Sequence, residues 1–385
     1  RFFIALLVDY EIDESNPIKG IKPLPNLDFK LMQGNSLVSE FRGINLDAEG
    51  SQTYGKLMKD DLDVLIDEFQ SRKSDFQNET DPKKKSQLKK IVENLIIKIF
   101  ESKLKEQKAG YLSQLESIKN KYSHFGNASK KAELIAKEIE ELNRKSGFDL
   151  KAAEKQLRDF TTGFVAKPFF AWKLYFAEVY NQKDGFDIVI ANPPYVSFGL
   201  RGTQRMADQE KEFLKHSYPD SAEYKISLYA VFMDKAIQLA NAHGIQTFIV
   251  PDSFLVGRYF SKVRGLILRK NSILELILLP YGVFDAVVGF SVVYLFQRQN
   301  VVPTSHKIYA RYIDSKDSLI HRTLKSFSYP QEYFRSLPYN RFRLFFSPIA
   351  KNFVDAVEAK SIPLNQVARI TTGVRSKIGQ DKIKS

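Results

Sequence analysis

Residues 186–195 of this 385-residue chain read Phe186-Asp187-Ile188-Val189-Ile190-Ala191-Asn192-Pro193-Pro194-Tyr195. The first six residues form a short, mostly apolar run, which is typical of a strand buried in a sheet. The two prolines that follow have no backbone N–H and a fixed φ, so they end strand pairing and restrict the directions of the neighbouring carbonyls. The sequence therefore predicts a buried strand that ends at a rigid turn.

The turn offers a particular set of polar groups. The Asn192 side chain has an acceptor oxygen and an NH₂ donor, so its oxygen and the Pro193 carbonyl can both accept from one exocyclic amino group. Tyr195 can stack on the ring that bears this amino group. The pattern favours a socket for a planar amine, and the alternative is a plain turn, since these residue types are common in turns for local reasons.

The motif and its flanks resemble one enzyme family. Phe186 to Tyr195 resembles the catalytic motif of DNA methyltransferases that modify N6 of adenine. Leu24 to Leu37 is similar to the segment before the catalytic strand in restriction-modification methyltransferases, particularly the type IIG, Eco57I-like group. Gly282 to Asp285, with Ser291 to Phe296 after it, resembles the later motif of that family. By resemblance, the chain is identified as an adenine-specific DNA methyltransferase of a restriction-modification system.

This resemblance implies a chemistry and a set of site residues. S-adenosyl-L-methionine would be the cofactor, and a flipped adenine in double-stranded DNA would be the substrate. The catalytic residues would be Asn192, Pro193, Pro194 and Tyr195. Tyr195 and Phe284 would contact the flipped base, although Phe284 fits a core position equally well. Asn35 would lie near the adenine of the cofactor, where the family often has Asp.

The fold expected is α/β: a partial Rossmann-like class I methyltransferase sheet with a long helical insertion. Strands are predicted at residues 27–37, 186–191, 245–250, 273–279 and 291–297, and helices at 227–242 and 260–269. Their order predicts a mostly parallel sheet that finishes in a β-hairpin, with the last strand antiparallel. Ligands of such sheets bind beyond the carboxyl ends of the strands, where Asn35, Asn192 and Pro251-Asp252 are expected to gather.

The insertion occupies residues 55–165 and is rich in Lys and Glu. Apolar residues such as Leu88 and Ile91 recur in it at helical spacing, which predicts two to four helices in a coiled-coil-like arm. Breaks are expected near Asp81-Pro82 and Gly126-Asn127. The arm either braces neighbouring domains or follows DNA phosphates, and its interleaved charges favour the bracing role.

The expected organisation has five parts. They are a first part of the methyltransferase core (1–54), the insertion (55–165), the core with the catalytic turn (166–300), a connector (301–360) and the start of a target-recognition domain (361–385). The last assignment comes from a likeness of Ile362 to Gly373 to the opening of recognition domains in type I specificity subunits. No two glycines stand two residues apart, so the glycine-rich cofactor turn of the family is expected upstream of a fragment.

Composition agrees with a polyanionic partner. The formal net charge of +13 favours double-stranded DNA, because Lys and Arg release condensed counterions when they neutralise phosphates. Arg201, Arg205 and Lys211, just after the catalytic turn, are expected to bind phosphates, or else are ordinary surface charges. No apolar run or signal peptide points to a membrane, which favours the cytoplasm. The chain has no cysteine and its five histidines lack metal-ligand spacing, so no metal is expected.

Two other functions stay open at this stage. A methyltransferase that acts on RNA or on a protein glutamine can use the same turn, because glutamine also presents an amide NH₂ group. A non-catalytic DNA-binding module would explain the missing glycine turn. A nuclease domain, if the full-length protein has one, is expected outside this chain.

Overall fold

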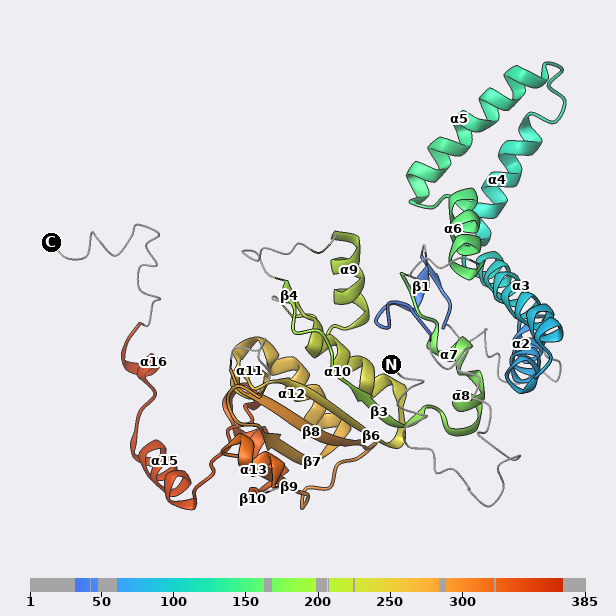
Figure 1. Ribbon diagram of the computed structural model, residues 1–385. Coiled ribbons are helices and arrows are strands. Elements are labelled where there is room, and N and C mark those ends of the chain that lie inside the picture. Colours follow the sequence, from blue (N-terminus) through green and yellow to red (C-terminus); the bar gives the residue numbers. More distant parts are fainter. Residues whose placement is uncertain are drawn as a thin grey trace, which may run out of the picture. The chain divides into compact units, whose positions relative to one another are not determined.

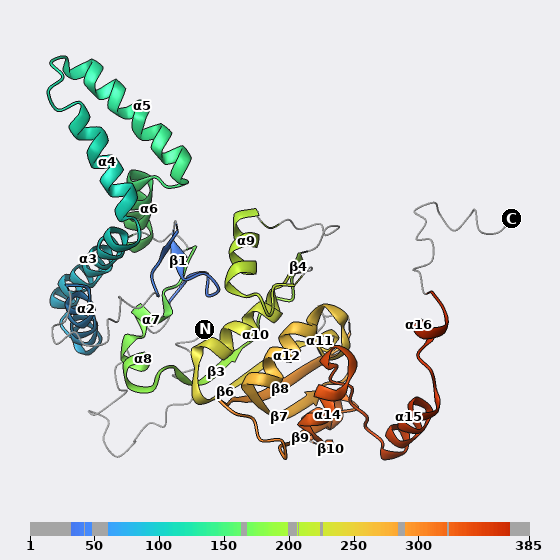
Figure 2. The ribbon, with the colours of Figure 1, turned by 180° about the vertical axis from the view of Figure 1, so that it is seen from behind.

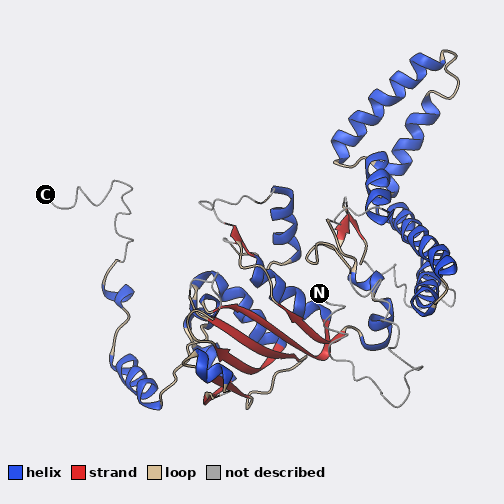
Figure 3. Ribbon diagram, viewed as in Figure 1, coloured by secondary structure: helices blue, strands red, loops and turns tan. Residues whose placement is uncertain are grey.

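The computed structural model describes residues 32–41, 43–47, 61–162, 168–198, 206, 208–223, 226–283, 289–321 and 323–369. The predicted α/β class is confirmed, and the chain divides into two compact units, residues 1–185 and 186–385 (Figures 1 and 2). The described part of the first unit is mostly helical, whereas the second unit is built on a six-stranded sheet (Figure 3).

The first unit contains the predicted insertion. Within residues 61–162 the insertion forms five helices rather than two to four: α2 (Asp61–Asn78), α3 (Pro82–Gln107), α4 (Ala109–Lys121), α5 (Ala128–Ser146) and α6 (Leu150–Thr162). It is flanked by the two-residue strands β1 (Glu40–Phe41) and β2 (Ile44–Asn45) and by the short helices α7 (Trp172–Tyr175) and α8 (Ala177–Lys183).

Both predicted helix breaks are confirmed by their caps. The Asp81 carboxylate accepts hydrogen bonds from the N–H groups of residues 83 and 84, at 2.8 and 2.9 Å, and so begins α3. Asn127 caps α5 in the same way, through the N–H of residue 130 at 3.0 Å. The additional helices arise at two further breaks, at Lys108 between α3 and α4 and at Gly147, whose φ of 64° ends α5.

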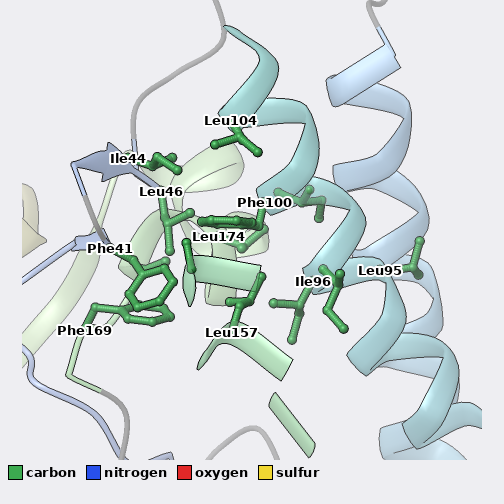
Figure 4. Packing of buried hydrophobic residues seen from close by; sticks show 14 of the residues in the cluster. Phe41, Ile44, Leu46, Leu95, Ile96, Phe100, Leu104, Leu157, Phe169 and Leu174 are labelled. Atoms are coloured by element: carbon green, nitrogen blue, oxygen red, sulfur yellow. The ribbon is translucent and has the colours of Figure 1, made fainter. Parts of the chain in front are cut away.

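Helix α3 lies in the hydrophobic core of the first unit. Ile99 and Phe100 on this helix are fully buried. The Phe100 ring centroid lies 5.7 Å from that of Phe41 in β1, which in turn lies 4.9 Å from Phe169 after the insertion (Figure 4). The insertion therefore shares one core with residues on both sides of it. The structure differs here from the predicted division, which assigned 1–54, 55–165 and 166–300 to separate parts.

The strand predicted at residues 27–37 is described only from residue 32. Residues 32–37 form a turn and no strand, and the earlier part lies outside the described residues. Gly34 occupies a tight position in this turn, because a Cβ atom added to it would lie 2.6 Å from the Phe169 carbonyl oxygen.

The sheet of the second unit has the strand order β10-β9-β7-β8-β6-β3. The strands are β3 (Phe186–Ala191), β6 (Ala240–Pro251), β7 (Asn271–Leu278), β8 (Ser291–Arg298), β9 (Lys307–Tyr312) and β10 (Lys325–Pro330). Strand β3 is parallel to β6, while β8 lies antiparallel between β6 and β7. The predicted antiparallel pairing of β7 with β8 is thereby confirmed. The sheet as a whole is mixed and not mostly parallel, since three of its five strand pairings are antiparallel, and it does not finish at β8, because β9 and β10 follow.

The prediction that the strand before the turn is buried is wrong. Strand β3 lies at the edge of the described sheet, and the side chains of Ile188 and Ile190 are 65% and 76% exposed. Only its inner-facing residues Val189 and Ala191 pack against the core. An apolar run alone does not distinguish a central strand from an edge strand.

Helices cover the sheet and connect its strands. They are α9 (Asp208–Ser217), α10 (Leu228–Leu239), α11 (Ser253–Val256) and α12 (Ser261–Lys270), with the 3₁₀ turn η2 (Arg258–Phe260) before α12. The predicted helices at 227–242 and 260–269 correspond to α10 and α12. Helix α10 is buried on most of its surface, including Asp234 and Lys235, so it is less amphipathic than predicted.

Residues 307–346, predicted as part of a connector, extend the same sheet. Strands β9 and β10 add to β7 at its free edge, and α13 (Lys316–Ile320) lies between them. After β10 come α14 (Gln331–Ser336) and η3 (Pro338–Asn340), and Phe334 and Phe342 from this segment are fully buried in the core. Helices α15 (Pro348–Lys360) and α16 (Leu364–Val367) follow. Of the recognition segment predicted at 361–385, the structure describes residues 361–369.

Candidate active site

The turn Asn192 to Tyr195 follows β3 directly, at the carboxyl end of the parallel pair β3–β6 (Figure 1). Asn192 and Pro194 are exposed, Pro193 is buried, and Tyr195 is half-buried. The burial of Pro193 and its fixed φ hold the turn in one conformation. The Asn192 amide is thus presented to solvent at the edge where ligands of open α/β sheets bind.

Tyr195 is held at two points. Its hydroxyl donates a hydrogen bond to the Ile249 carbonyl of β6 at 3.0 Å. Its ring packs edge-on against Tyr229 of α10, with centroids 6.3 Å apart and an interplanar angle of 83°. Burial raises the pKa of Tyr195, so its hydroxyl stays protonated and keeps donating. The ring is therefore fixed in position before any ligand binds.

Tyr229 was not identified from the sequence, yet it connects the turn to the rest of the site. Burial raises its pKa to about 12, and its hydroxyl shares a hydrogen bond of 3.1 Å with the Ser253 hydroxyl in α11. Its ring also stacks on Phe260 in η2, with centroids 5.3 Å apart. These contacts join segments that are 24 or more residues apart in sequence, so no local pattern indicates them.

The chain beyond the turn is tied back to α10. Strand β4 (Ser197–Phe198) pairs antiparallel with β5 (Ile226–Ser227), and the Leu228 N–H donates to the Val196 carbonyl at 2.9 Å. The turn is thus fixed on one side by β3 and on the other by the start of α10.

Asp252 lies at the same sheet edge, immediately after β6. Its N–H donates to the Phe290 carbonyl at 3.0 Å, next to the start of β8. Partial burial raises the pKa of the Asp252 carboxyl group. Of the expected gathering of Asn35, Asn192 and Pro251-Asp252, the part within the second unit is found, since β3 and β6 are neighbouring parallel strands. Asn35 lies in the first unit, so its place beside these residues stays a prediction.

The loop between β7 and β8 contains the predicted base contact Phe284, which lies outside the described residues. Two aromatic residues that flank it are described and were not identified from the sequence. Tyr281 and Phe290 are 64% and 37% exposed, and their ring centroids lie 5.9 Å apart in an edge-on pair. Both rings are exposed beside the edge of the sheet where ligands are expected to bind, and this exposure marks the two residues as candidate ligand contacts.

Asn35 lies in the first unit, in the turn of residues 32–37. Its side-chain oxygen accepts from the Leu37 N–H at 3.2 Å, and its backbone carbonyl accepts from the Val38 N–H at 3.1 Å. The neighbouring Ser36 carbonyl accepts from the Trp172 indole N–H at 3.0 Å. The Asn35 oxygen therefore stabilises the turn, which leaves the NH₂ group for other contacts.

Of the three predicted phosphate contacts, Arg201 and Arg205 lie outside the described residues. Lys211 is half-buried on α9, whose first turn contains two carboxylates, Asp208 and Glu210. Phosphate binding by these three residues stays a prediction. In the part of the chain that the structure describes, no three His, Asp or Glu side chains gather as metal ligands. None of the described helices is both long and apolar enough to cross a bilayer.

Comparison with known proteins identifies the family. The model of the Eco57I restriction-modification methylase family matches residues 53–284, more than half of the chain. A putative type II restriction enzyme and methyltransferase of Methanocaldococcus jannaschii is 23% identical over 317 residues, which are 74% of this chain and 23% of that protein. The chain therefore spans about a quarter of the length of this curated relative.

Solved structures give weaker similarities. The type IIG restriction endonuclease BpuSI matches with 16% identity and a TM-score of 0.34, over 50% of this chain and 25% of that one. A putative class I S-adenosylmethionine-dependent methyltransferase of Listeria monocytogenes matches with 15% identity and a TM-score of 0.30, over 67% and 88%. Because both TM-scores are low, the assignment rests on the sequence match, which confirms the resemblance inferred above. The chain belongs to the Eco57I restriction-modification methylase family.

Proposed function

We propose that this chain is the methyltransferase module of a site-specific DNA adenine-N6 methyltransferase. The main support is the turn at the end of β3, where an exposed amide, a fixed proline carbonyl and a positioned aromatic ring occur together. Family membership supports a methylase, and the geometry of the turn supports a planar amine as the acceptor.

Adenine N6 needs help to react, because its lone pair is delocalised into the ring and its edge is paired with thymine. A base taken out of the duplex costs a few kcal/mol in lost stacking. Hydrogen bonds from N6 to the Asn192 oxygen and to the Pro193 carbonyl would make the nitrogen more tetrahedral and direct its lone pair away from the ring plane. Correct positioning of this kind accounts for a large part of many rate enhancements.

The Tyr195 ring would stack on the flipped base and offset the cost of unstacking, at roughly 1–3 kcal/mol per base. Because its hydroxyl and its ring edge are already held by Ile249 and Tyr229, little conformational entropy is lost when the base binds. Phe284 is proposed as a second contact to the base, and the exposed pair Tyr281 and Phe290 flanks the same loop.

S-adenosyl-L-methionine is the proposed cofactor, and it would supply an electrophilic methyl group. The described residues fit its adenine end at one place: the half-buried Asn35 uses its oxygen within the turn, and its NH₂ group, which donates to none of the described residues, would donate to a ring nitrogen. An Asp at this position would offer only acceptors when ionised, so Asn35 implies a different hydrogen-bond pattern from that of relatives with Asp.

Double-stranded DNA is the proposed partner, and the cytoplasm the proposed location. The net charge of +13 supports a polyanion. The name of the Methanocaldococcus jannaschii relative combines a restriction enzyme with a methyltransferase, and on this basis we propose that a nuclease domain belongs to the same full-length protein. The resemblance of residues 362–373 to recognition domains supports sequence-specific action.

The test uses the intact protein that contains this chain, labelled S-adenosylmethionine and unmethylated plasmid DNA. Asn192→Ala removes one acceptor for N6, and we expect incorporation of the label into DNA to fall about 10²-fold or more, as when other preorganised hydrogen-bonding groups are lost. Digestion of the product to nucleosides should place the label on adenine N6.

Asn352→Ala is the matched control, because Asn352 is an exposed amide on α15, 160 residues after Asn192 in the sequence. It should leave incorporation unchanged. Equal activity of Asn192→Ala and the wild type would contradict the proposed role of the turn. Transfer of the label to RNA or to a glutamine-containing peptide, and not to DNA, would contradict the proposed substrate.

A further inference from the structure

A second group of charged and aromatic side chains lies in the sheet unit, outside the turn. Arg258 in η2 and Arg341 just after η3 both approach the Tyr339 ring, with guanidinium carbons 5.5 and 5.3 Å from its centroid. The Tyr339 side chain is 47% exposed, and Arg258 is exposed. We call these three residues the Tyr339 cluster.

In the part of the chain that the structure describes, no carboxylate forms an ion pair with the Tyr339 cluster, although the negative charge of Glu223 acts on the neighbouring Arg264. Neither Arg258 nor Arg341 has an acidic partner among the described residues, whereas other arginines of the same unit form ion pairs: Arg269, Arg311, Arg335 and Arg343. A third guanidinium, that of Arg264, lies close by, and its pKa is lowered to about 10 by burial and by the charge of Arg341. Like charges held together in this way favour an anion as ligand.

The turn that presents Tyr339 is held in an unfavourable conformation. Tyr339 and Asn340 have φ values of 60° and 52°, in the left-handed region, which Asn tolerates but which is unfavourable for Tyr. Arg264 is fully buried and donates to the carbonyls of both residues at 2.9 Å. It also donates to the carbonyls of Phe254 and Gly257 at 2.6 and 2.8 Å. Strain that is maintained by surrounding structure often occurs at functional sites.

The same hydrogen bonds connect the Tyr339 cluster to the candidate active site. Phe254 and Gly257 belong to the segment that follows β6, and η2 continues it with Phe260, whose ring stacks on Tyr229 at 5.3 Å. Tyr229 in turn contacts the Tyr195 ring. Arg258 is therefore two residues away from an aromatic contact chain that ends at the catalytic turn.

We propose that Arg258, Tyr339 and Arg341 bind a backbone phosphate region of double-stranded DNA beside the methyl-transfer site. The choice of DNA as the anion rests on the proposed function. The two guanidinium groups donate hydrogen bonds to phosphate oxygens, and the Tyr339 ring keeps them together. A contact of this type fixes the position of the duplex relative to Asn192 and reads no sequence.

The test measures binding of the 385-residue chain to a fluorescein-labelled duplex by anisotropy, from 50 to 200 mM KCl. The double variant Arg258→Gln/Arg341→Gln should show a slope of log K against log salt that is shallower by about 1.8, because each phosphate contact contributes about 0.9. Circular dichroism verifies that the variant is folded. If the double variant is unfolded, the single variant Arg258→Gln replaces it in the test. We expect this variant to make the slope shallower by about 0.9.

The matched control is Arg269→Gln/Lys325→Gln, which removes two positive charges that are exposed and paired with Asp220 and Asp314. We expect its slope to equal that of the wild type. An equal loss of slope in the control would show a net-charge effect and overturn the proposal, as would an unchanged slope in the Arg258 and Arg341 variants. An unchanged slope in the Arg258 and Arg341 variants leaves the proposed function standing, because methyl transfer to DNA is measured in a separate experiment. If the wild-type chain binds no duplex, both the proposal and DNA as partner fail.

Discussion

Asp234 is a carboxylic acid in the core of the sheet unit, with only 5% of its surface exposed. Its two carboxylate oxygens accept hydrogen bonds from the Ser221 hydroxyl at 2.8 Å and the Gln238 amide at 3.1 Å. Burial raises the pKa of Asp234, and these two hydrogen bonds oppose the rise only in part. The native protein therefore holds this proton at pH values where the unfolded chain has released it.

This difference in pKa determines how Asp234 affects stability. Between the unfolded pKa, about 4, and the raised native pKa, the native state binds more protons than the unfolded state, so the free energy of unfolding falls as pH rises through that window. Asp234→Asn removes the titrating group and keeps most of the shape. The wild type loses stability as pH rises through this window, and Asp234→Asn does not. We therefore expect the free energy of unfolding of Asp234→Asn, relative to that of the wild type, to increase between pH 4 and the native pKa of Asp234, by up to about 1.4 kcal/mol per pH unit.

Urea unfolding followed by circular dichroism at each pH measures this difference. Asp355→Asn is the control, since Asp355 is 43% exposed and its pairing with Lys351 is a surface interaction of at most about 1 kcal/mol. A relative stability of Asp234→Asn that stays constant with pH would contradict the assigned cause.

At the same scale, the sequence identified the turn that we propose to be catalytic, but not the contacts that hold it in place. Asn192 to Tyr195 stand together in the chain, and the properties of proline and asparagine can be read from their order. The bond from Tyr195 to Ile249 and the ring contact with Tyr229 join residues 54 and 34 positions apart. Contacts of this kind depend on the way β3, β6 and α10 pack, which no local pattern specifies.

Among the elements, α3 gives the clearest test of the first unit. Ile99 is completely buried on this helix, whereas Ile91, two turns earlier, is 40% exposed. Ile99→Ala leaves a cavity in the core that α3 shares with β1 and Phe169, so we expect a loss of about 2–5 kcal/mol in the free energy of unfolding. Ile91→Ala on the same helix should cost less than about 1 kcal/mol.

Trp172 is the single tryptophan of the chain and lies in the first unit, where its indole N–H donates to the Ser36 carbonyl. Its fluorescence during urea unfolding therefore reports on the unit that contains both isoleucines. Equal losses for Ile99→Ala and Ile91→Ala would mean that α3 is a solvated arm, as the sequence suggested, and not part of a core.

Elements were predictable where a strong local signal marks them. Strands β6, β7 and β8 follow from apolar runs, and the starts of α3 and α5 follow from Asp81 and Asn127, which cap them. Strands β9 and β10 were missed because each has only six residues, mixes charged or hydroxyl side chains with aromatic ones, and contains no continuous apolar run. Their place in the sheet depends on pairing with β7, a tertiary interaction.

For the molecule as a whole, we expect DNA binding and cofactor binding to depend on different features of the chain. Of the net charge of +13, +11 lies in residues 186–385, which hold 27 Lys and Arg against 16 Asp and Glu. This charge is a property of the chain itself, so DNA binding needs no cofactor. A glycine-rich strand-to-helix turn, by contrast, has to be present for tight binding of a nucleotide-type cofactor, and no glycine pair of this spacing occurs in the sequence. We expect the 385-residue chain to bind duplex DNA and to bind S-adenosylmethionine only in the millimolar range, or not measurably.

Isothermal titration of the chain with S-adenosylmethionine, with and without a saturating DNA duplex, measures this expectation. A longer form that carries the glycine-rich turn expected from the sequence serves as the positive control, and in it the same titration should give micromolar affinity. Micromolar binding by the 385-residue chain alone would contradict the prediction and show that cofactor capture does not require a glycine-rich turn. If neither the chain nor the intact protein binds the cofactor while both bind DNA, the family fold has been kept as a DNA-binding module, and the turn at Asn192 has lost its reaction.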